Sequence, residues 1–346
     1  MLLGIFLFLD IAVVTSFTTI ALAFHDHRPP LIHTTPFHFQ NKQRHLPSPL
    51  HLTTNKTNQQ TMGSVSSRIQ TSLLHTFWSL ATKCGLRRLG DWIKHWYPSA
   101  YGDTIFYVPP EKNQSPDPPQ AMMIGLTIDD GLFRSDQGGT PMIAEVCDLL
   151  RRYQAHATFF VCTNYITPTQ VQQVLQDHGS HEFGNHLKED KSGYYYKLDE
   201  IQFAKELDES NAILQQAIRT ATAKDDHGNN APKIQWFRAP QGVMSSAMAQ
   251  VLQERQMIHV LGDCYCDDWA FAEKLGSTTQ LVAPLMLNQV QPGSIAIFHM
   301  PQRGFREATL QALEEFLEGL KERNLQCVTL SELMKHQLQQ PQQNLP

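Results

Sequence analysis

A histidine and an aspartate stand four residues apart in the segment HEFGNHLKED, which spans residues 181–190. At this spacing His186 and Asp190 would share one face of a helical turn, where an imidazole and a carboxylate can bind one cation. The pair is only half of a site, because surface helices carry such pairs by chance. A metal centre would need a further ligand from another part of the chain and a group that activates water.

Apolar segments alternate with amphipathic ones along most of the chain. The pattern predicts strands at 122–128, 157–162, 181–183, 234–237, 258–262, 294–298 and 327–330. It predicts helices that begin at Thr140-Pro141, Thr167-Pro168 and Asp199, and a further helix over 304–323. Such alternation argues for a parallel sheet. Because the unit repeats many times and no nucleotide-binding glycine pattern follows the first strand, we expect a barrel rather than an open sheet.

Polar residues directly follow five of the predicted strands. In a parallel barrel, side chains at the carboxyl ends of the strands converge on one face. Each residue alone has an ordinary explanation, since an Asp-Gly pair is usually a turn. Five such positions on one rim are hard to attribute to chance. They are occupied by Asp129 and Asp130, by His186 and Asp190, by Arg238, by Asp268 and Trp269, and by His299.

These segments resemble the five ordered motifs of the polysaccharide deacetylases, the NodB-like carbohydrate esterases. The motifs read TIDDG (127–131), NHLKED (185–190), RAPQG (238–242), DDW (267–269) and IFH (297–299). Their order and their approximate separations match the family over residues 105–335. The resemblance implies an α/β fold, the distorted (β/α) barrel of the polysaccharide deacetylase type. It also implies a hydrolase that removes acetyl groups from a glycan of the N-acetylglucosamine, chitin or peptidoglycan kind, or from another acetylated polysaccharide or oligosaccharide.

The resemblance implies one divalent metal ion, held by Asp130, His186 and Asp190. Zinc accepts such nitrogen and oxygen ligands and keeps an open position for water in catalytic sites. Asp190 stands where the family usually has a second histidine, which resembles a subgroup of deacetylase-like proteins. Two carboxylates and one imidazole form a harder set of donors, so zinc is expected first, with manganese or cobalt as alternatives.

The remaining roles also follow from the resemblance. Asp129 would be the general base that deprotonates water, with Arg238 beside it. His299 would protonate the leaving amine, and Asp268 would orient this histidine and keep it charged. The substrate would contact the backbone of Gln241 at the oxyanion and the side chains of Trp269 and Ile297 at the acetyl group.

Two other functions stay open, because a fold does not guarantee a chemistry. A non-catalytic glycan-binding protein of the same type would have no need of Asp129 and His299, so their presence argues against it. An amidohydrolase that acts on a small cyclic or linear amide would differ in the shape of its groove, which the sequence leaves open.

Composition excludes several classes of protein. The formal net charge is −5 and no run of Lys and Arg predicts a nucleic-acid groove. Six cysteines are too sparse for a disulfide scaffold, and the single residue between Cys264 and Cys266 is not the usual spacing of a zinc knuckle. The oligomeric state is left open.

The first hundred residues differ from the rest of the chain. Residues 1–23 are apolar and end in small residues, which favours a signal peptide cleaved near Ala23 or a membrane-anchoring helix. Residues 24–99 contain many hydroxyl residues and few acids, as in a transit segment or a partly disordered linker. The catalytic domain is predicted at 100–338 and a disordered tail at 339–346.

The N-terminal segment sets the expected location of the protein. A signal peptide or anchor predicts the secretory pathway, with a secreted or membrane-anchored product. The Ala23-Phe24 junction resembles that of bipartite plastid presequences, so a plastid is an alternative. Translation from Met62 would instead expose an N-myristoylation pattern that begins at Gly63.

Overall fold

The computed structural model describes residues 57–109, 122–176, 181–191, 193–222, 233–273 and 279–335, with side chains from residue 70 onward. One compact unit comprises Ser64–Pro346. The predicted signal or anchor segment (1–23) and the predicted tail (339–346) lie outside the described residues. Within the described ranges, no helix combines the length and the apolar character that a membrane span requires.

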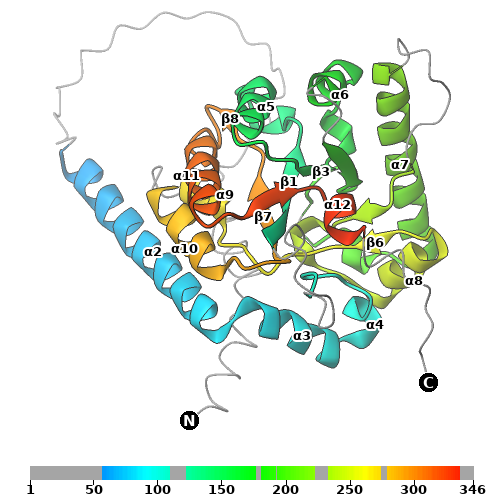
Figure 1. The fold of residues 1–346 in the computed structure, drawn as a ribbon, viewed down its shortest axis with the longest axis horizontal. Coiled ribbons are helices and arrows are strands. Elements are labelled where there is room, and N and C mark those ends of the chain that lie inside the picture. The colour runs from blue at the N-terminus through cyan, green and yellow to red at the C-terminus, as the bar shows by residue number, and fades with distance from the viewer. Residues whose placement is uncertain are drawn as a thin grey trace, which may run out of the picture. The chain divides into compact units, whose positions relative to one another are not determined.

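A parallel sheet forms the centre of the unit (Figure 1). Its strands follow the order β6-β5-β4-β3-β1-β7, and β9 also pairs with β1. All of these pairings are parallel. The strands are β1 (Met123–Gly131), β3 (Thr158–Val161), β4 (Glu182–Asn185), β5 (Trp236–Phe237), β6 (Ile258–His259), β7 (Ile295–His299) and β9 (Gln326–Val328).

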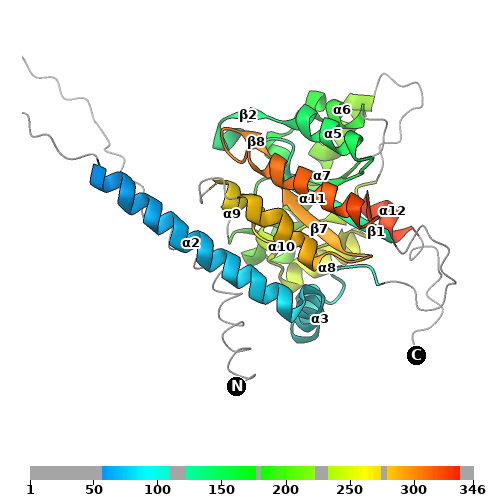
Figure 2. The same ribbon diagram turned by 60° about the vertical axis from the view of Figure 1, so that its left-hand side comes forward.

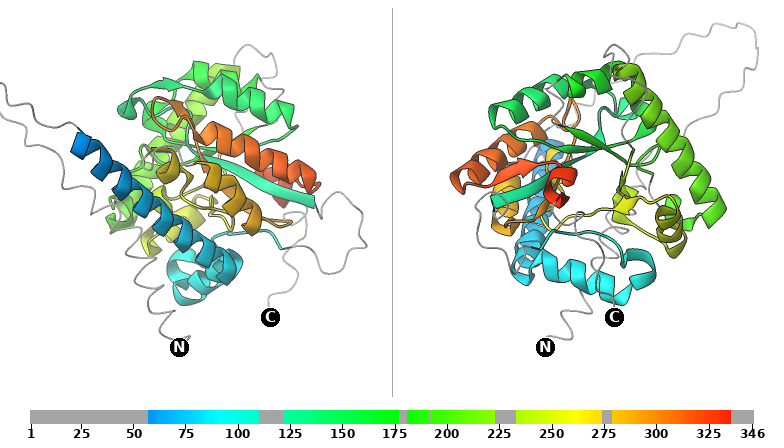
Figure 3. Two further views of the ribbon diagram at one scale, coloured as in Figure 1. Left: turned by 90° about the vertical axis from the view of Figure 1, so that its left-hand side faces the viewer. Right: turned by 45° about the vertical axis from the view of Figure 1, so that its right-hand side comes forward.

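Among the described residues, the two ends of this strand order are joined directly by one bridge and indirectly by Ile105 and Tyr107, which pair with Val260 after β6 and with Ser294 before β7. Cys264, a few residues after β6, pairs in parallel with Ala296 of β7. The sheet therefore curls toward closure without a complete ladder between β6 and β7, which is the distorted barrel that the sequence predicts. Helices surround the strands, as the right-hand view of Figure 3 shows.

The helices alternate with the strands along the chain. Thr167 starts α6 through a capping box with Gln170, and Asp199 precedes α7, as predicted. Each long helix buries an apolar face, for example Phe203, Leu207 and Leu214 of α7. The helices of this layer are α5 (Ile143–Arg152), α6 (Pro168–Leu175), α7 (Glu200–Thr222), α8 (Ser246–Glu254), α9 (Asp268–Glu273), α10 (Val282–Gln289), α11 (Thr309–Glu322) and α12 (Leu330–Met334).

Two local predictions are wrong. Thr140-Pro141 does not begin a helix: it forms β2 (Thr140–Pro141), which pairs in antiparallel fashion with β8 (Gln302–Arg303), and α5 begins later, at Ile143. The first strand continues through Asp129 and Asp130, because Asp129 stays in register with His299 on the neighbouring strand β7. The paired acidic residues therefore belong to the sheet itself.

The start of the packed region also differs from the predicted boundary at residue 100. Residues 57–99 contain α2 (Thr57–Cys84) and α3 (Leu86–Trp96), which follow each other directly (Figure 2). Trp78 of α2 is 6% exposed and packs edge-on against Tyr265, with 5.3 Å between the ring centroids. Arg87 of α3 forms an ion pair of 2.6 Å with Asp263. Residues 64–99 of the predicted linker thus belong to the compact unit.

Replacement of Trp78 by alanine is expected to lower the free energy of unfolding by about 3–5 kcal/mol. The change leaves a cavity in the core and removes the hydrogen bond of 3.1 Å from the indole Nε1 to Asp267 Oδ2. Leu80→Ala on the same helix is the matched control, because Leu80 is 49% exposed and its loss should cost less than about 0.5 kcal/mol. Urea unfolding followed by circular dichroism measures both. Equal values for the two variants would show that α2 is not part of the folded core.

Candidate active site

Two adjacent aspartates lie at the carboxyl end of β1. Asp129 is 5% exposed and Asp130 is 2% exposed. Asp130 adopts a left-handed backbone conformation with φ 56°, which residues other than glycine rarely do. Leu187, Gln241 and Asp267, at three further motifs, share this conformation. Backbone strain of this kind gathers at functional sites, so the rim of the barrel is where chemistry is expected.

Arg238 holds the first aspartate. Its Nη1 lies 2.6 Å from Asp129 Oδ1 and donates a second hydrogen bond of 2.8 Å to Thr127 Oγ1. Its Nε donates to the carbonyl of Val260 at 2.9 Å. Burial lowers the pKa of Arg238 and the charge of Asp129 opposes that shift. With a further hydrogen bond of 3.3 Å from Nη2 to the carbonyl of Leu261, four partners hold the guanidinium in place, and it fixes the orientation of the Asp129 carboxylate.

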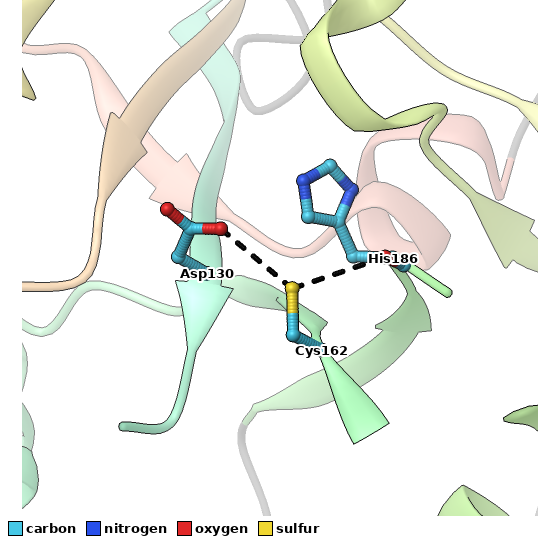
Figure 4. A group of neighbouring side chains, drawn as sticks. All are labelled: Asp130, Cys162 and His186. Atoms are coloured by element: carbon cyan, nitrogen blue, oxygen red, sulfur yellow. Dashed lines mark hydrogen bonds between the residues drawn. The ribbon is translucent and has the colours of Figure 1, made fainter. Parts of the chain in front are cut away.

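The second aspartate lies in a different group. Ligand atoms of Asp130, Cys162 and His186 all lie within 4.8 Å of one another (Figure 4). The His186 Nδ1 lies 2.8 Å from the carbonyl oxygen of Arg238. Because a carbonyl only accepts, Nδ1 carries the proton, and the Nε2 lone pair is left for a cation.

Cys162 is a member of this group that the sequence reasoning missed. It directly follows β3, and its Sγ lies 3.6 Å from Asp130 Oδ1. Burial, together with the negative charges of Asp130 and Asp190, raises the pKa of the Cys162 thiol well above its usual value. The thiol is therefore protonated here and donates to Asp130. The signal was available, because Cys162 stands at a strand end like the other rim residues, but it was counted as the last residue of the strand 157–162.

Asp190 comes close to the group without being one of its three members. Its Oδ1 is buried and has no hydrogen-bond partner among the described residues. Burial and the negative charge of Asp130 raise the pKa of Asp190. A buried carboxylate oxygen without a donor is a position that a cation would satisfy. This oxygen, Asp130 and the Nε2 of His186 are donors of the types that a divalent ion accepts, and their joint binding of an ion stays a prediction.

Two arginines, which the sequence reasoning also missed, contact Asp130. Arg306 Nη1 lies 2.6 Å from Asp130 Oδ2, and Arg134 Nη1 lies 3.4 Å from Oδ1. Burial alone would raise the pKa of Asp130, but the charges of Arg306 and Arg134 lower it below the ordinary carboxyl value. Arg134 follows Asp130 by four residues, which is the one sequence signal for this contact. Arg306 has no such signal.

A histidine and an aspartate form a pair on the other side of β1. His299 Nδ1 lies 2.7 Å from Asp268 Oδ1, and the backbone N–H of His299 donates to Oδ2 at 2.9 Å. Asp268 is fully buried. Burial by itself would lower the pKa of His299, but the Asp268 carboxylate outweighs this and raises it to about 8. The His299 imidazole is thus protonated at neutral pH, and Asp268 holds it in a fixed orientation.

Comparison with known proteins relates this arrangement to a family. A family model for polysaccharide deacetylase matches residues 117–258. The peptidoglycan-N-acetylglucosamine deacetylase of Bacillus cereus is 28% identical over 223 residues, which cover 63% of this chain and 91% of that protein. Residues 117–258 thus match a polysaccharide deacetylase domain, in agreement with the motifs.

Solved structures of this family share the fold. The peptidoglycan deacetylase PdaC of Bacillus subtilis aligns with a TM-score of 0.50 and 21% identity over 65% of this chain and 95% of that chain. A CE4 family pseudoenzyme of Bacillus anthracis aligns with a TM-score of 0.51 and 18% identity over 67% of this chain and 68% of that chain. A mutant of that pseudoenzyme with restored enzymatic activity aligns equally well, with a TM-score of 0.51. The deacetylase fold therefore accommodates both active and inactive sites, and the side chains of each member decide its activity.

The three predicted substrate contacts lie on the same rim of the deacetylase barrel. Gln241 follows β5 with φ 58°. Trp269 lies in α9, where its Nε1 donates to the Tyr265 hydroxyl at 3.2 Å. Ile297 of β7 is 8% exposed and lies opposite Thr127 of β1. Their contact with substrate stays a prediction.

Proposed function

We propose that this protein is a metal-dependent hydrolase that removes acetyl groups from an N-acetylated or O-acetylated glycan. The observation that carries the proposal is the separation of two adjacent carboxylates into different environments. Both carboxylates pair with arginines, but Asp129 has Arg238 as its partner, whereas Asp130 pairs with Arg306 and also lies beside the imidazole of His186. Two neighbouring carboxylates with different partners are suited to different tasks, one as a base and one as a ligand.

The residues of the chain would divide the reaction between them. When bound by Asp130, His186 and Asp190, a divalent ion supplies Lewis-acid polarisation of the acetyl carbonyl, with zinc expected first and manganese or cobalt as alternatives. Asp129, oriented by Arg238, accepts a proton from the attacking water. His299 donates a proton to the leaving nitrogen, and Asp268 keeps it charged until then. The backbone N–H of Gln241 is assigned to the developing oxyanion.

The substrate class is inferred from a relative. The Bacillus cereus protein is named for peptidoglycan N-acetylglucosamine, so N-acetylglucosamine units are our first choice for the sugar. The apolar segment 1–23 supports a location in the secretory pathway, where such glycans are made or displayed, with a secreted or membrane-anchored form.

The test is release of acetate by the full-length chain. The protein is stripped with a chelator, reloaded with zinc, manganese or cobalt, and incubated with chitin oligomers, peptidoglycan and acetylxylan. We expect acetate from at least one glycan, and only after metal is restored. Binding of a glycan without acetate release under any of these conditions would favour the second candidate, a non-catalytic glycan-binding protein. The ion pairs on Asp130 and the pseudoenzyme among the structural neighbours are the observations that keep this candidate in view.

The rate of deacetylation is expected to fall as the pH rises through about 8. His299 must be protonated to donate, and its pKa is raised to about 8, so the acid form is lost above that pH. Asp268→Asn removes the charge that raises this pKa, and the alkaline limb of the profile should then move to lower pH. Profiles of kcat against pH for the two proteins measure the shift. An alkaline limb at the same pH in both proteins would remove His299 from the role of general acid.

A further inference from the structure

Arg306 reaches Asp130 from a segment that is fastened to the loop after β1. Arg306 lies between β8 and α11 and is 6% exposed. Its backbone N–H donates to the carbonyl of Gln302 at 2.9 Å. The Gln302 side chain accepts from the backbone N–H of Arg134 at 2.9 Å and donates to the carbonyl of Arg134 at 3.1 Å. The two segments that carry the arginines are thus tied together beside Asp130.

The two arginines hold Asp130 unequally. Arg306 makes the short contact, 2.6 Å to Oδ2. Arg134 lies farther away, 3.4 Å from Oδ1, and directs its Nε and Nη2 to Asp136 at 2.9 Å each. Arg306 is therefore the principal counter-charge of Asp130 in this structure.

A divalent ion bound at Asp130 would compete for the carboxylate oxygens that the arginines already contact, and it would lie close to their positive charges. The ion would need a carboxylate oxygen of Asp130, while Arg306 occupies Oδ2 and Arg134 and Cys162 approach Oδ1. A guanidinium that stayed in contact with this carboxylate would repel a dication a few ångströms away, in surroundings that screen charge poorly. Arg306 therefore does not stabilise the metal-bound form of Asp130. Contact of Arg306 with this carboxylate and binding of the ion oppose each other.

We propose that Arg306 competes with the divalent metal ion for Asp130, so that loading of the ion requires the Arg306–Asp130 ion pair to open. This inference rests on the proposed metal site of Asp130, His186 and Asp190. The apparent affinity for the ion is then the intrinsic affinity multiplied by the fraction of molecules in which Asp130 is released. Arg306 thereby sets the concentration of metal at which the site fills.

The test measures the metal affinity of the full-length protein in the absence of substrate, so it does not depend on enzymatic activity. Apoprotein competes with a fluorescent chelator for zinc and, separately, for manganese. Arg306→Gln removes the charge and is expected to bind each ion roughly tenfold to a hundredfold more tightly than the wild type, which is the range of a lost charge-assisted hydrogen bond. Arg303→Gln is the matched control: Arg303 lies on the same segment, is 52% exposed and pairs with Glu145 and Glu307, so its loss should leave the affinity unchanged.

The outcomes separate this inference from the proposed function. Unchanged or weaker binding by Arg306→Gln, with measurable binding by the wild type, overturns the competition and leaves the metal site standing. Binding by neither protein overturns both. Circular dichroism checks that the variant folds. If it does not fold, Arg306→Met replaces it: the unbranched side chain fills much of the same space without a charge, and an affinity no higher than that of the wild type would contradict the proposal.

Discussion

Asp129→Asn is expected to lower the rate of deacetylation by about 10²–10⁴-fold, the usual contribution of a positioned general base. The amide keeps the size of the side chain but cannot accept the proton of the attacking water. Arg238 would still be held by Thr127 and by the carbonyl of Val260, so the surrounding structure should stay in place. Acetate release under saturating substrate measures the effect.

Measurement of bound metal separates the loss of a general base from the disruption of the whole active site. The metal content of Asp129→Asn should equal that of the wild type, because the proposed ligands are Asp130, His186 and Asp190, and the carboxylate of Asp129 pairs with Arg238 instead. Asp148→Asn is a matched control, since its carboxylate is 65% exposed on α5 and pairs with Arg151 on the same helix. Near-normal acetate release by Asp129→Asn would mean that another group takes the proton.

The barrel fold and the polar residues at the carboxyl ends of its strands could be predicted from the sequence, because both depend on local sequence patterns. Strands alternate with helices over most of the chain, and the carboxyl ends of parallel strands must face the same way. The contacts of Arg238 with Asp129 and of Asp268 with His299 are what the resemblance to the polysaccharide deacetylases implies, and the structure contains both. The roles of these residues in catalysis stay predictions.

The environment of Asp130 could not be predicted, because it depends on contacts between distant loops. Arg306 lies 176 residues from Asp130 and belongs to a turn whose position is set by Gln302 and by the short ladder between β2 and β8. That ladder is two residues long on each side, too short to produce an alternating pattern. Thr140-Pro141, one strand of this ladder, has the residue types of a helix N-cap and first helical position. The sequence pattern therefore predicts a helix start at these two residues.

The N-terminal helices were missed for a different reason. Residues 24–99 were assigned by composition, which averages over the whole segment, and the hydroxyl-rich part hid the apolar face of α2 and α3. Among their contacts, Trp78 donates a hydrogen bond to Asp267 and Arg87 forms an ion pair with Asp263. Both partners lie in the chain that follows β6, close to the motif residue Asp268. The signal in the sequence is the aromatic content of residues 70–99, with Trp78, Trp92 and Trp96, which is compatible with packing against the barrel but does not name the partners.

His186→Ala is expected to abolish stoichiometric metal binding and to reduce acetate release to the background. His186 supplies the one imidazole of the proposed site, and its Nε2 is oriented by the hydrogen bond of 2.8 Å from Nδ1 to the carbonyl of Arg238. Loss of a direct ligand should weaken binding by more than the roughly 10–100-fold that follows loss of a residue behind a ligand. Elemental analysis after dialysis, together with acetate release, measures both effects.

His156→Ala serves as the control for His186→Ala, because His156 is a partly exposed histidine that pairs with Glu332, away from the rim. The removed imidazole also leaves the Arg238 carbonyl without its donor, which should cost about 1–3 kcal/mol of stability, so urea unfolding must show that the variant is folded at the assay temperature. A folded His186→Ala protein with one bound ion would exclude His186 from the ligand set. The ion would then have to be held by Asp130 and Asp190 alone, against the charge of Arg306. Since two carboxylates beside a guanidinium are a poor site for a dication, we expect the ion to be lost.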